Sequence, residues 1–177
     1  MKKLLLILPL IFLLCFTFAC QDKEAMAELE EFRAQAALEE ANMALVMRLT
    51  DAFKNHDIEA MKEIYSADLI SHTPQGDKSL EEALESTKQE YVMFPNVTIS
   101  IEDSFAKGDK VATRFTWIGT HEGDIEGFPA TGKEVELSGL NMFRIENGKV
   151  VEEWFEYDNL SFYQQLGFEL KPKEEEK

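Results

Sequence analysis

The hydrophobic periodicity of the chain changes at Pro95, and this change constrains the fold more than any other feature. Before it, apolar residues such as Val46, Leu49 and Phe53 recur at the spacing of an α-helix. After it, apolar and polar residues alternate with the period of two that is typical of a β-strand. Helices followed by a run of strands predict an α+β fold, in which the helices pack on one face of a curved antiparallel sheet.

Local signals place three helices before this change. The apolar pattern predicts a first helix over about residues 43–55, and Asp57 is suited to cap a second one. Ser79 and Glu82 form a capping box, in which each side chain satisfies a free backbone amide of the other residue. A third helix is therefore expected to begin there and to run to about residue 92.

Four strands are expected after Pro95, over residues 97–107, 111–121, 135–145 and 150–158. The dipeptide Asn147-Gly148 predicts a hairpin turn between the last two, because both residues adopt positive φ at low cost.

Alternation divides each strand into two faces. On the first strand, the residues expected on one face are Val97, Ile99, Ile101, Asp103 and Phe105. On the last strand, Trp154 and Asp158 share one face, while Phe155 and Tyr157 share the other. These faces mix apolar and charged residues, which favours a sheet wrapped around a cavity lined by aromatic and polar groups. With Asp158 facing that cavity, Phe155 or Tyr157 would face outward and contribute to a dimer contact.

The charge of the chain excludes one class of partner. There are 18 Lys and Arg against 34 Asp and Glu, which gives a formal net charge of −16. Phosphate binding requires clustered Lys and Arg, so a nucleic-acid partner is not expected. No metal site is expected either, because no two histidines are four residues apart and both cysteines, Cys15 and Cys20, precede the folded domain.

The first residues predict a targeting segment. Two lysines precede an uncharged apolar run over residues 4–16, and Ala19-Cys20 follows. A Cys directly after a small residue is typical of the bacterial lipoprotein box, in which Cys20 is lipidated and becomes the new N-terminus. We expect a signal peptide over residues 1–19 and a lipid-anchored protein of the bacterial cell envelope. An uncleaved anchor and a plain secreted protein are the alternatives.

The remaining chain is expected to contain one domain. Residues 20–42 are acidic and rich in Ala and Glu, which predicts a tether or the solvated start of a helix. The domain itself is expected over residues 43–168, and residues 169–177 are expected to form a charged tail.

Four side chains are candidates for chemistry. Asp158 closes the last strand, where it serves either as a general acid/base or as the cap of the following turn. His72 and His121 are candidates for catalysis, with a structural histidine as the alternative for each. Arg114 contacts either a substrate or a neighbouring carboxylate.

Taken in order, several segments resemble the SnoaL-like polyketide cyclases, also called ester cyclases, over about residues 43–168. The segments that carry the resemblance are Asp68–Pro74, Ile101–Asp103, Gly108–Arg114, Gly119–Gly123, Gly127–Lys133, Asn147–Trp154, Asp158–Leu160 and Gln164–Gly167.

The resemblance implies the cone-like α+β fold of the nuclear transport factor 2 superfamily, a curved sheet wrapped around the N-terminal helices with a pocket inside. It also implies a homodimer through the outer face of the sheet. In the true cyclases, the Asp four residues after a Trp is the acid/base of an aldol closure that needs no cofactor. Asp158 lies four residues after Trp154 and matches that position. The resemblance implies five further site residues. His72 and His121 are expected to take part in catalysis, and Arg114, Trp117 and Trp154 are expected to bind substrate.

Two classes of function follow. The first is a membrane-tethered, cofactor-free enzyme that transfers a proton in a small organic molecule through Asp158, in an aldol cyclisation, an isomerisation or a hydrolysis. The second is a non-catalytic envelope lipoprotein that binds a small apolar ligand or a protein partner. An enzyme requires Asp158 inside the pocket with a raised pKa, whereas a binder requires only the cavity.

Overall fold

The computed structural model describes the backbone of residues 4–124, 129–169 and 171, and the side chains of these residues from residue 23 onward. The chain divides into two compact units, Met1–Leu38 and Glu39–Lys177. The first unit holds the greater part of helix α1 (Leu4–Lys54), and its described side chains are nearly all exposed. The acidic segment is thus helical. The predicted boundaries at residues 19 and 42 stay predictions.

In the second unit, helices α2 (Ile58–Ile64) and α3 (Leu80–Met93) begin at the caps that the sequence predicts. The Asp57 carboxylate accepts a hydrogen bond of 2.9 Å from the amide of Ala60. At the start of α3, the Glu82 carboxylate accepts from the amide of Ser79 at 2.8 Å, and the Ser79 hydroxyl accepts from the amide of Glu82. Side-chain oxygens therefore satisfy backbone donors that a helix start leaves free.

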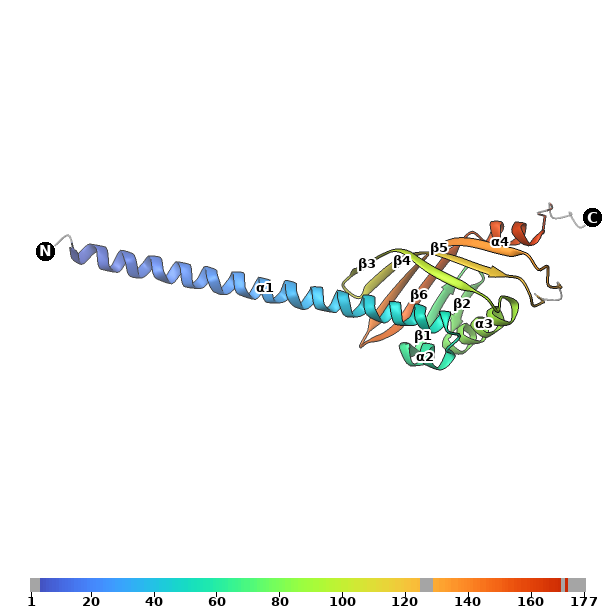
Figure 1. Cartoon of the computed structure of the whole chain (residues 1–177). Helices are drawn as coiled ribbons and strands as arrows, with labels where there is room; N and C mark the ends of the chain where they lie inside the picture. Colours follow the sequence, from blue (N-terminus) through green and yellow to red (C-terminus); the bar gives the residue numbers. More distant parts are fainter. Residues whose placement is uncertain (1–3, 125–128, 170, 172–177) are drawn as a thin grey trace, which may run out of the picture. The chain divides into compact units, whose positions relative to one another are not determined.

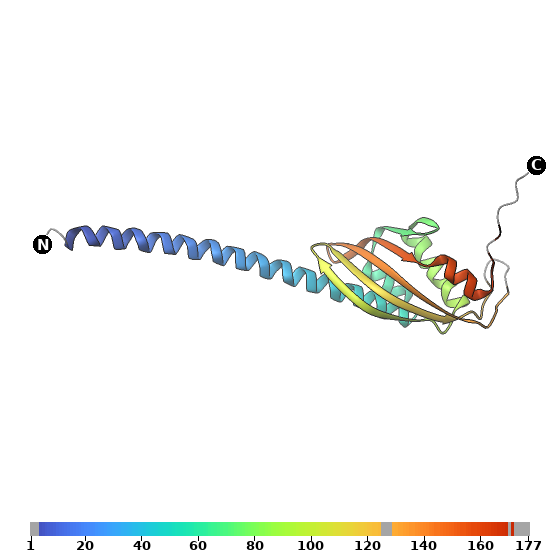
Figure 2. The ribbon, with the colours of Figure 1, turned by 90° about the horizontal axis from the view of Figure 1, so that it is seen from above.

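One six-stranded sheet forms the rest of the unit, in the order β2-β1-β6-β5-β4-β3. Its strands are β1 (Tyr65–Thr73), β2 (Gly76–Ser79), β3 (Thr98–Lys107), β4 (Lys110–Thr120), β5 (Glu134–Glu146) and β6 (Lys149–Tyr157). All neighbours are antiparallel except β1 and β6, which are parallel. The sheet is curved and does not close into a barrel, and α2 and α3 cover one face (Figures 1 and 2). The predicted α+β cone fold is confirmed. A short helix α4 (Asn159–Leu166) follows β6.

A bulge makes part of the predicted face of β3 wrong. Ile101 pairs with Phe115 and Asp103 with Arg114, so the register shifts between them. Ile99 and Ile101 face the helices, whereas Asp103 and Phe105 lie on the opposite, outer face of the sheet. A bulge adds one residue to a strand and inverts the alternation beyond it.

Trp154 lies on the opposite face of β6 from Phe155 and Tyr157, as predicted, but the predicted directions of these two faces are wrong. Ile145 pairs with Val150 and Arg144 with Glu152, so Val151 is the extra residue of a bulge. Beyond it, Phe155 and Tyr157 lie on the inner face with the buried Glu153, and Trp154 lies on the outer face. Phe155 and Tyr157 are therefore not on the outer face, where the sequence placed a dimer contact through one of them.

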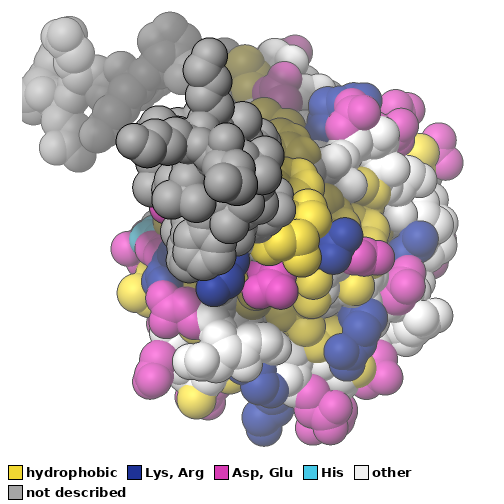
Figure 3. All heavy atoms as spheres, turned by 90° about the vertical axis from the view of Figure 1, so that its left-hand side faces the viewer, with side chains coloured by type: hydrophobic (Ala, Val, Ile, Leu, Met, Phe, Trp, Pro, Cys, Tyr) yellow, Lys and Arg dark blue, Asp and Glu magenta, His cyan; other side chains and the backbone are white. Residues whose placement is uncertain are grey.

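Two apolar clusters fill the inner side of the sheet. The first joins the end of α1, α2 and α3 to β1, β6 and the hairpin ends of β4 and β5. The second, around Phe94, Phe115 and Trp117, joins the end of α3 to α4 and the other ends of β4 and β5. Apolar side chains also lie at the surface. On the face drawn in Figure 3, a band of them lies between charged side chains.

Candidate functional site

The end of α3 brings a carboxyl group against the inner face of the sheet. Glu90 lies in the last turns of α3 and is partly buried, and its Oε1 accepts a hydrogen bond of 2.8 Å from Trp117 Nε1 on β4. Burial raises the pKa of Glu90 from 4.5 to about 7, against the opposing effects of the Trp117 hydrogen bond and the Lys78 ammonium. A carboxyl group with a pKa near 7 is suited to accept and return protons at physiological pH.

Tyr157, at the end of β6, belongs to the same site. Its hydroxyl accepts a hydrogen bond of 3.3 Å from Gln75 Nε2 in the β1–β2 turn. Burial raises the pKa of Tyr157, and the negative charge of Glu90 raises it further. We call Glu90, Trp117, Tyr157 and Gln75 the Glu90 site.

His121 and Trp117 meet the same aromatic ring. His121 follows β4, is fully buried, and its Nδ1 accepts a hydrogen bond of 3.2 Å from the amide of Thr131. The His121 ring lies 5.5 Å from the ring of Phe94, which packs edge-on against Trp117 at 4.9 Å. The structure thus places two predicted site residues, Trp117 and His121, on the inner side of the sheet. They lie near the end of α3, where Glu90 is.

Asp158 occupies the start of α4. Its carboxylate accepts a hydrogen bond of 2.9 Å from the amide of Ser161, and the side chain is exposed. This is the capping geometry that the sequence offered as the alternative to acid/base chemistry. Asp158 directly follows Tyr157 and therefore adjoins the Glu90 site along the chain. Its catalytic role stays a prediction.

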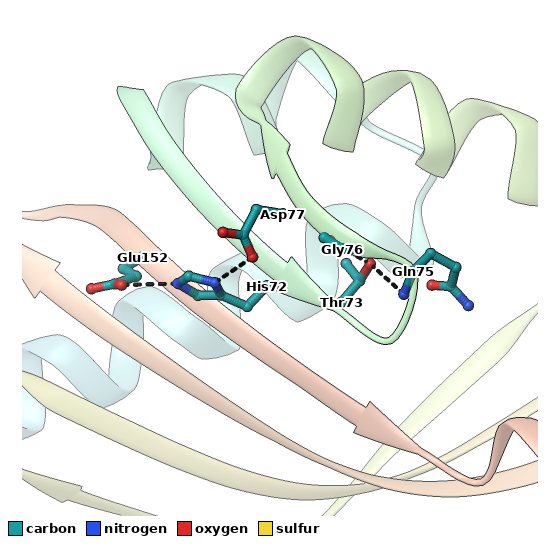
Figure 4. A network of polar contacts seen from close by, with 6 residues as sticks. All are labelled: His72, Thr73, Gln75, Gly76, Asp77 and Glu152. Carbon is teal, nitrogen blue, oxygen red and sulfur yellow. Dashed lines mark hydrogen bonds and ion pairs between the residues drawn. The ribbon is translucent and has the colours of Figure 1, made fainter.

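His72 lies on the outer face of the sheet, between two carboxylates (Figure 4). Its Nδ1 lies 2.7 Å from Asp77 Oδ1 on β2, and its Nε2 lies 2.9 Å from Glu152 Oε1 on β6. The imidazole also stacks on Trp154 at a centroid distance of 5.2 Å. The hydrogen bond with Glu152 and, next, that with Asp77 raise the pKa of His72, because both favour the imidazolium.

Arg114 lies on the outer face too. Its Nε and Nη2 donate to Asp103 Oδ2 at 2.9 and 2.6 Å. His72, Trp154 and Arg114 are therefore on the opposite side of the sheet from Trp117 and His121. Cys20 lies outside the residues whose side chains are described.

Two carboxyl groups were not singled out from the sequence, those of the partly buried Glu90 and the buried Glu153. Glu153 is only 2% exposed, and its Oε2 accepts a hydrogen bond of 2.9 Å from the Tyr65 hydroxyl. Burial raises its pKa to about 7, which outweighs the hydrogen bonds from Ser71 and Tyr65. A signal was present in the sequence, because Glu153 lies between the apolar Val151 and Phe155 on one predicted face of the strand.

An open groove of about 700 Å³ lies between β2 and α3. It is lined by Gln75, Gly76, Asp77, Lys78, Glu81, Glu82, Glu85 and Ser86. Gln75 is common to this groove and to the Glu90 site, so the groove borders the site at the β1–β2 turn.

Within the described ranges, no group of three or more His, Cys, Asp or Glu side chains is arranged to hold a metal ion. In the part of the chain that the structure describes, no helix is both long and apolar enough to cross a membrane.

Known proteins have a similar sequence and architecture. The family model of the SnoaL-like polyketide cyclases matches residues 44–166. IdmH from Streptomyces antibioticus, a proposed polyketide cyclase, is 31% identical over 72% of this chain and 99% of its own, with a TM-score of 0.65. AclR from Streptomyces galilaeus, a proposed hydroxylase, is 25% identical over 71% of this chain and 95% of its own, with a TM-score of 0.67.

A proposed SnoaL-like polyketide cyclase from Jannaschia sp. CCS1 shares the fold, at 21% identity over 73% of this chain and 93% of its own and with a TM-score of 0.67. No curated protein matches the chain. Because the family model covers more than half of the chain and IdmH exceeds 30% identity over nearly its full length, the chain belongs to the SnoaL-like polyketide cyclase family.

Proposed function

We propose that this protein binds a small organic molecule on the inner side of its sheet and transfers a proton within it, without a cofactor, through Glu90. The observation that carries the proposal is the Glu90 carboxyl group, which has a pKa of about 7 and is held by Trp117 beside the aromatic cluster of the inner face. Membership of a family that includes proposed polyketide cyclases supports cyclisation or isomerisation as the reaction.

Asp158 is the second candidate for the proton-transfer group in this proposal. The family resemblance supports it, because Asp158 lies four residues after Trp154, and its position next to Tyr157 supports it as well. Its hydrogen bond with the Ser161 amide does not occupy every lone pair, since a carboxylate offers about four acceptor positions.

A non-catalytic binder is the alternative function, and one observation favours it. The exposed Asp158 carboxylate caps α4, so that the residue at the family's acid/base position has a structural task here. A binder would use the same inner aromatic face and would show no turnover.

We further propose that the protein is tethered to a bacterial membrane through lipid on Cys20. The basic start, the apolar run and Ala19-Cys20 support this proposal. Expression in a bacterium supplied with labelled fatty acid is expected to label the wild type and not Cys20→Ser. Equal labelling of both, or of neither, would contradict it.

The experiment for the catalytic proposal compares Glu90→Gln with Asp158→Asn. Gln retains an oxygen that accepts from Trp117, and Asn is as good a helix cap as Asp, so both variants are expected to fold. Substrates come from a screen of small carbonyl compounds, followed as turnover against pH. Glu90→Gln is expected to lower kcat by about 10²–10⁴, the usual contribution of a general acid/base, and to remove the inflection near pH 7.

The result separates the candidates. Loss of turnover in Asp158→Asn alone would assign the chemistry to Asp158 instead. Binding without turnover in the wild type would support the binder. Glu134→Gln, an exposed change on β5, serves as the control.

A further inference from the structure

Lys78 reaches from strand β2 to the helix that carries Glu90. In the register of β1 with β2, the neighbouring Asp77 pairs with His72, and both lie on the outer face of the sheet. Because side chains alternate along a strand, Lys78 lies on the opposite, inner face. Its Nζ donates a hydrogen bond of 2.8 Å to Ser86 Oγ on α3. The Lys78 ammonium is therefore held against α3.

Ser86 anchors this ammonium in a defined position. The Ser86 hydroxyl donates its own proton to the carbonyl oxygen of Glu82 at 2.8 Å, so its oxygen accepts from Lys78. An ammonium group has three donors, and the open groove that Lys78 and Ser86 both line gives water access to the other two. The charge of Lys78 thus stays partly hydrated, which lowers the cost of holding it against the helix.

The anchor places the ammonium beside Glu90. Ser86 and Glu90 are four residues apart on α3, and such residues lie on one face of a helix with about 5–6 Å between their Cβ atoms. The positive charge of Lys78 accordingly lowers the pKa of Glu90, against the larger effect of burial. The aromatic groups around Glu90 carry no charge near neutral pH. Trp117 donates its N–H, and burial raises the pKa of Tyr157 and raises that of Tyr91 to about 13.

Other carboxylates compete for the charge of Lys78. Those that line the groove with it belong to Asp77, Glu81, Glu82 and Glu85. All four side chains are exposed, whereas Glu90 is partly buried. Water and salt screen interactions between exposed charges more than interactions that involve a buried group. The charge of Lys78 therefore acts on Glu90 in spite of these neighbours.

We propose that Lys78 is a positioning residue for Glu90: its ammonium, anchored on Ser86, stabilises the Glu90 carboxylate and keeps it able to accept a proton from a substrate at neutral pH. The assignment rests on the proposed function of Glu90. Without the charge of Lys78, burial holds a larger fraction of Glu90 in the protonated form, which cannot act as a base. The resulting loss of activity is confined to acidic and neutral pH.

The first test follows the titration of Glu90 in the full chain without ligand, through the indole N–H signal of Trp117 in ¹⁵N–¹H NMR spectra. Lys78→Met is expected to raise the midpoint by about 0.5–1 pH unit from its wild-type value near 7. Lys78→Arg keeps the charge, so its midpoint is expected to stay near that of the wild type. Lys88→Met is the matched control, because Lys88 is exposed and residues two apart in a helix do not face each other.

Turnover against pH is the second test, with a carbonyl substrate from the screen. For Lys78→Met, kcat is expected to fall about three- to tenfold at pH 6 and to match the wild type at pH 9, because the fraction of Glu90 carboxylate changes in this way. A loss of equal size at every pH, or a Trp117 midpoint that Lys78→Met leaves unchanged, would refute the positioning role and leave catalysis through Glu90 intact.

Failure of the proposed function itself would look different. The wild type would then bind without turnover, or Asp158→Asn alone would lose activity, while the Trp117 midpoint would still move in Lys78→Met. Either result would overturn the role of Lys78 in catalysis together with that of Glu90.

Discussion

The buried Glu153 carboxyl makes the stability of the protein dependent on pH. Its pKa is about 7 in the folded protein and near 4.5 in the unfolded chain, so between these values the folded state binds more protons. The free energy of unfolding therefore falls as the pH rises from about 4.5 to 7. Above pH 7, the hydrogen bonds from Tyr65 and Ser71 do not offset the free-energy cost of burying the charged Glu153 carboxylate.

Glu153→Gln is expected to remove this part of the pH dependence. The variant should match the wild type near pH 4.5 and exceed it at pH 8 by up to about 3 kcal/mol, from a shift of roughly 2.5 pKa units. Urea denaturation across this range measures the effect, and Glu156→Gln, exposed on the same strand, is the control. A variant that is less stable than the wild type at pH 8 would show that the charged form of Glu153 is stabilising.

His72 supplies a second prediction at this scale. Both of its nitrogens face carboxylate oxygens, which only accept, so both contacts are complete only when the imidazole is protonated. NMR titration is expected to give a pKa above 6.5 for His72. Glu152→Gln should lower that pKa more than Asp77→Asn, because the Glu152 contact is the stronger cause and Asp77 is more exposed. Equal or absent effects would contradict this ranking.

At the scale of elements, the sequence predicted what local signals determine. The caps at Asp57 and Ser79 and the turn at Asn147-Gly148 need only neighbouring residues, and all three are present in the structure. The parallel pairing of β1 with β6 joins distant segments, and strand β2 and helix α4 carry weak local patterns; none of these was predicted.

The difference between local signals and the pairing of distant segments also explains the wrong predictions at the site. The bulge at Val151 depends on how β6 pairs with β5, and alternation alone cannot locate it. Tyr157 was assigned outward because Asp158 was expected to face the cavity, although Tyr157 lies in the Glu90 site. Glu90 could not be recognised as a buried acid, because its burial arises from the packing of α3 against Trp117 on a distant strand.

Gly139 tests the packing between β4 and β5. A Cβ at this position would collide with the ring of Phe115 and would lie 2.7 Å from the carbonyl oxygen of Glu156. Gly139→Ala is expected to lower the free energy of unfolding by about 1–3 kcal/mol, the usual cost of overpacking. In urea denaturation, Phe115→Leu should cost less in the Gly139→Ala background than in the wild type, because it relieves the collision. Additive losses would show that the ring does not cause the strain.

At the scale of the whole molecule, the outer face of the sheet is where a second copy is expected to bind. Phe105 and Leu140 are 69% and 59% exposed there, and Ile70 is 46% exposed. Exposed apolar side chains on one sheet face are typical of an association surface. Sedimentation should show a dimer of the wild type and a monomer of Leu140→Glu. A wild-type monomer at about 10–100 µM, where weak homodimers are populated, would refute the dimer.

The central claim is that ligands bind on the inner face of the sheet, beside Glu90. The chain has two tryptophans, one on each face, so their indole N–H signals in a ¹⁵N–¹H NMR spectrum distinguish the faces. Trp154→Phe assigns them. On titration with 2-naphthol, the Trp117 signal is expected to shift and the Trp154 signal to stay in place; without ligand, the Trp117 signal should follow the titration of Glu90 with a midpoint near pH 7. A shift of Trp154 alone, or saturable binding that moves neither signal, would contradict the claim.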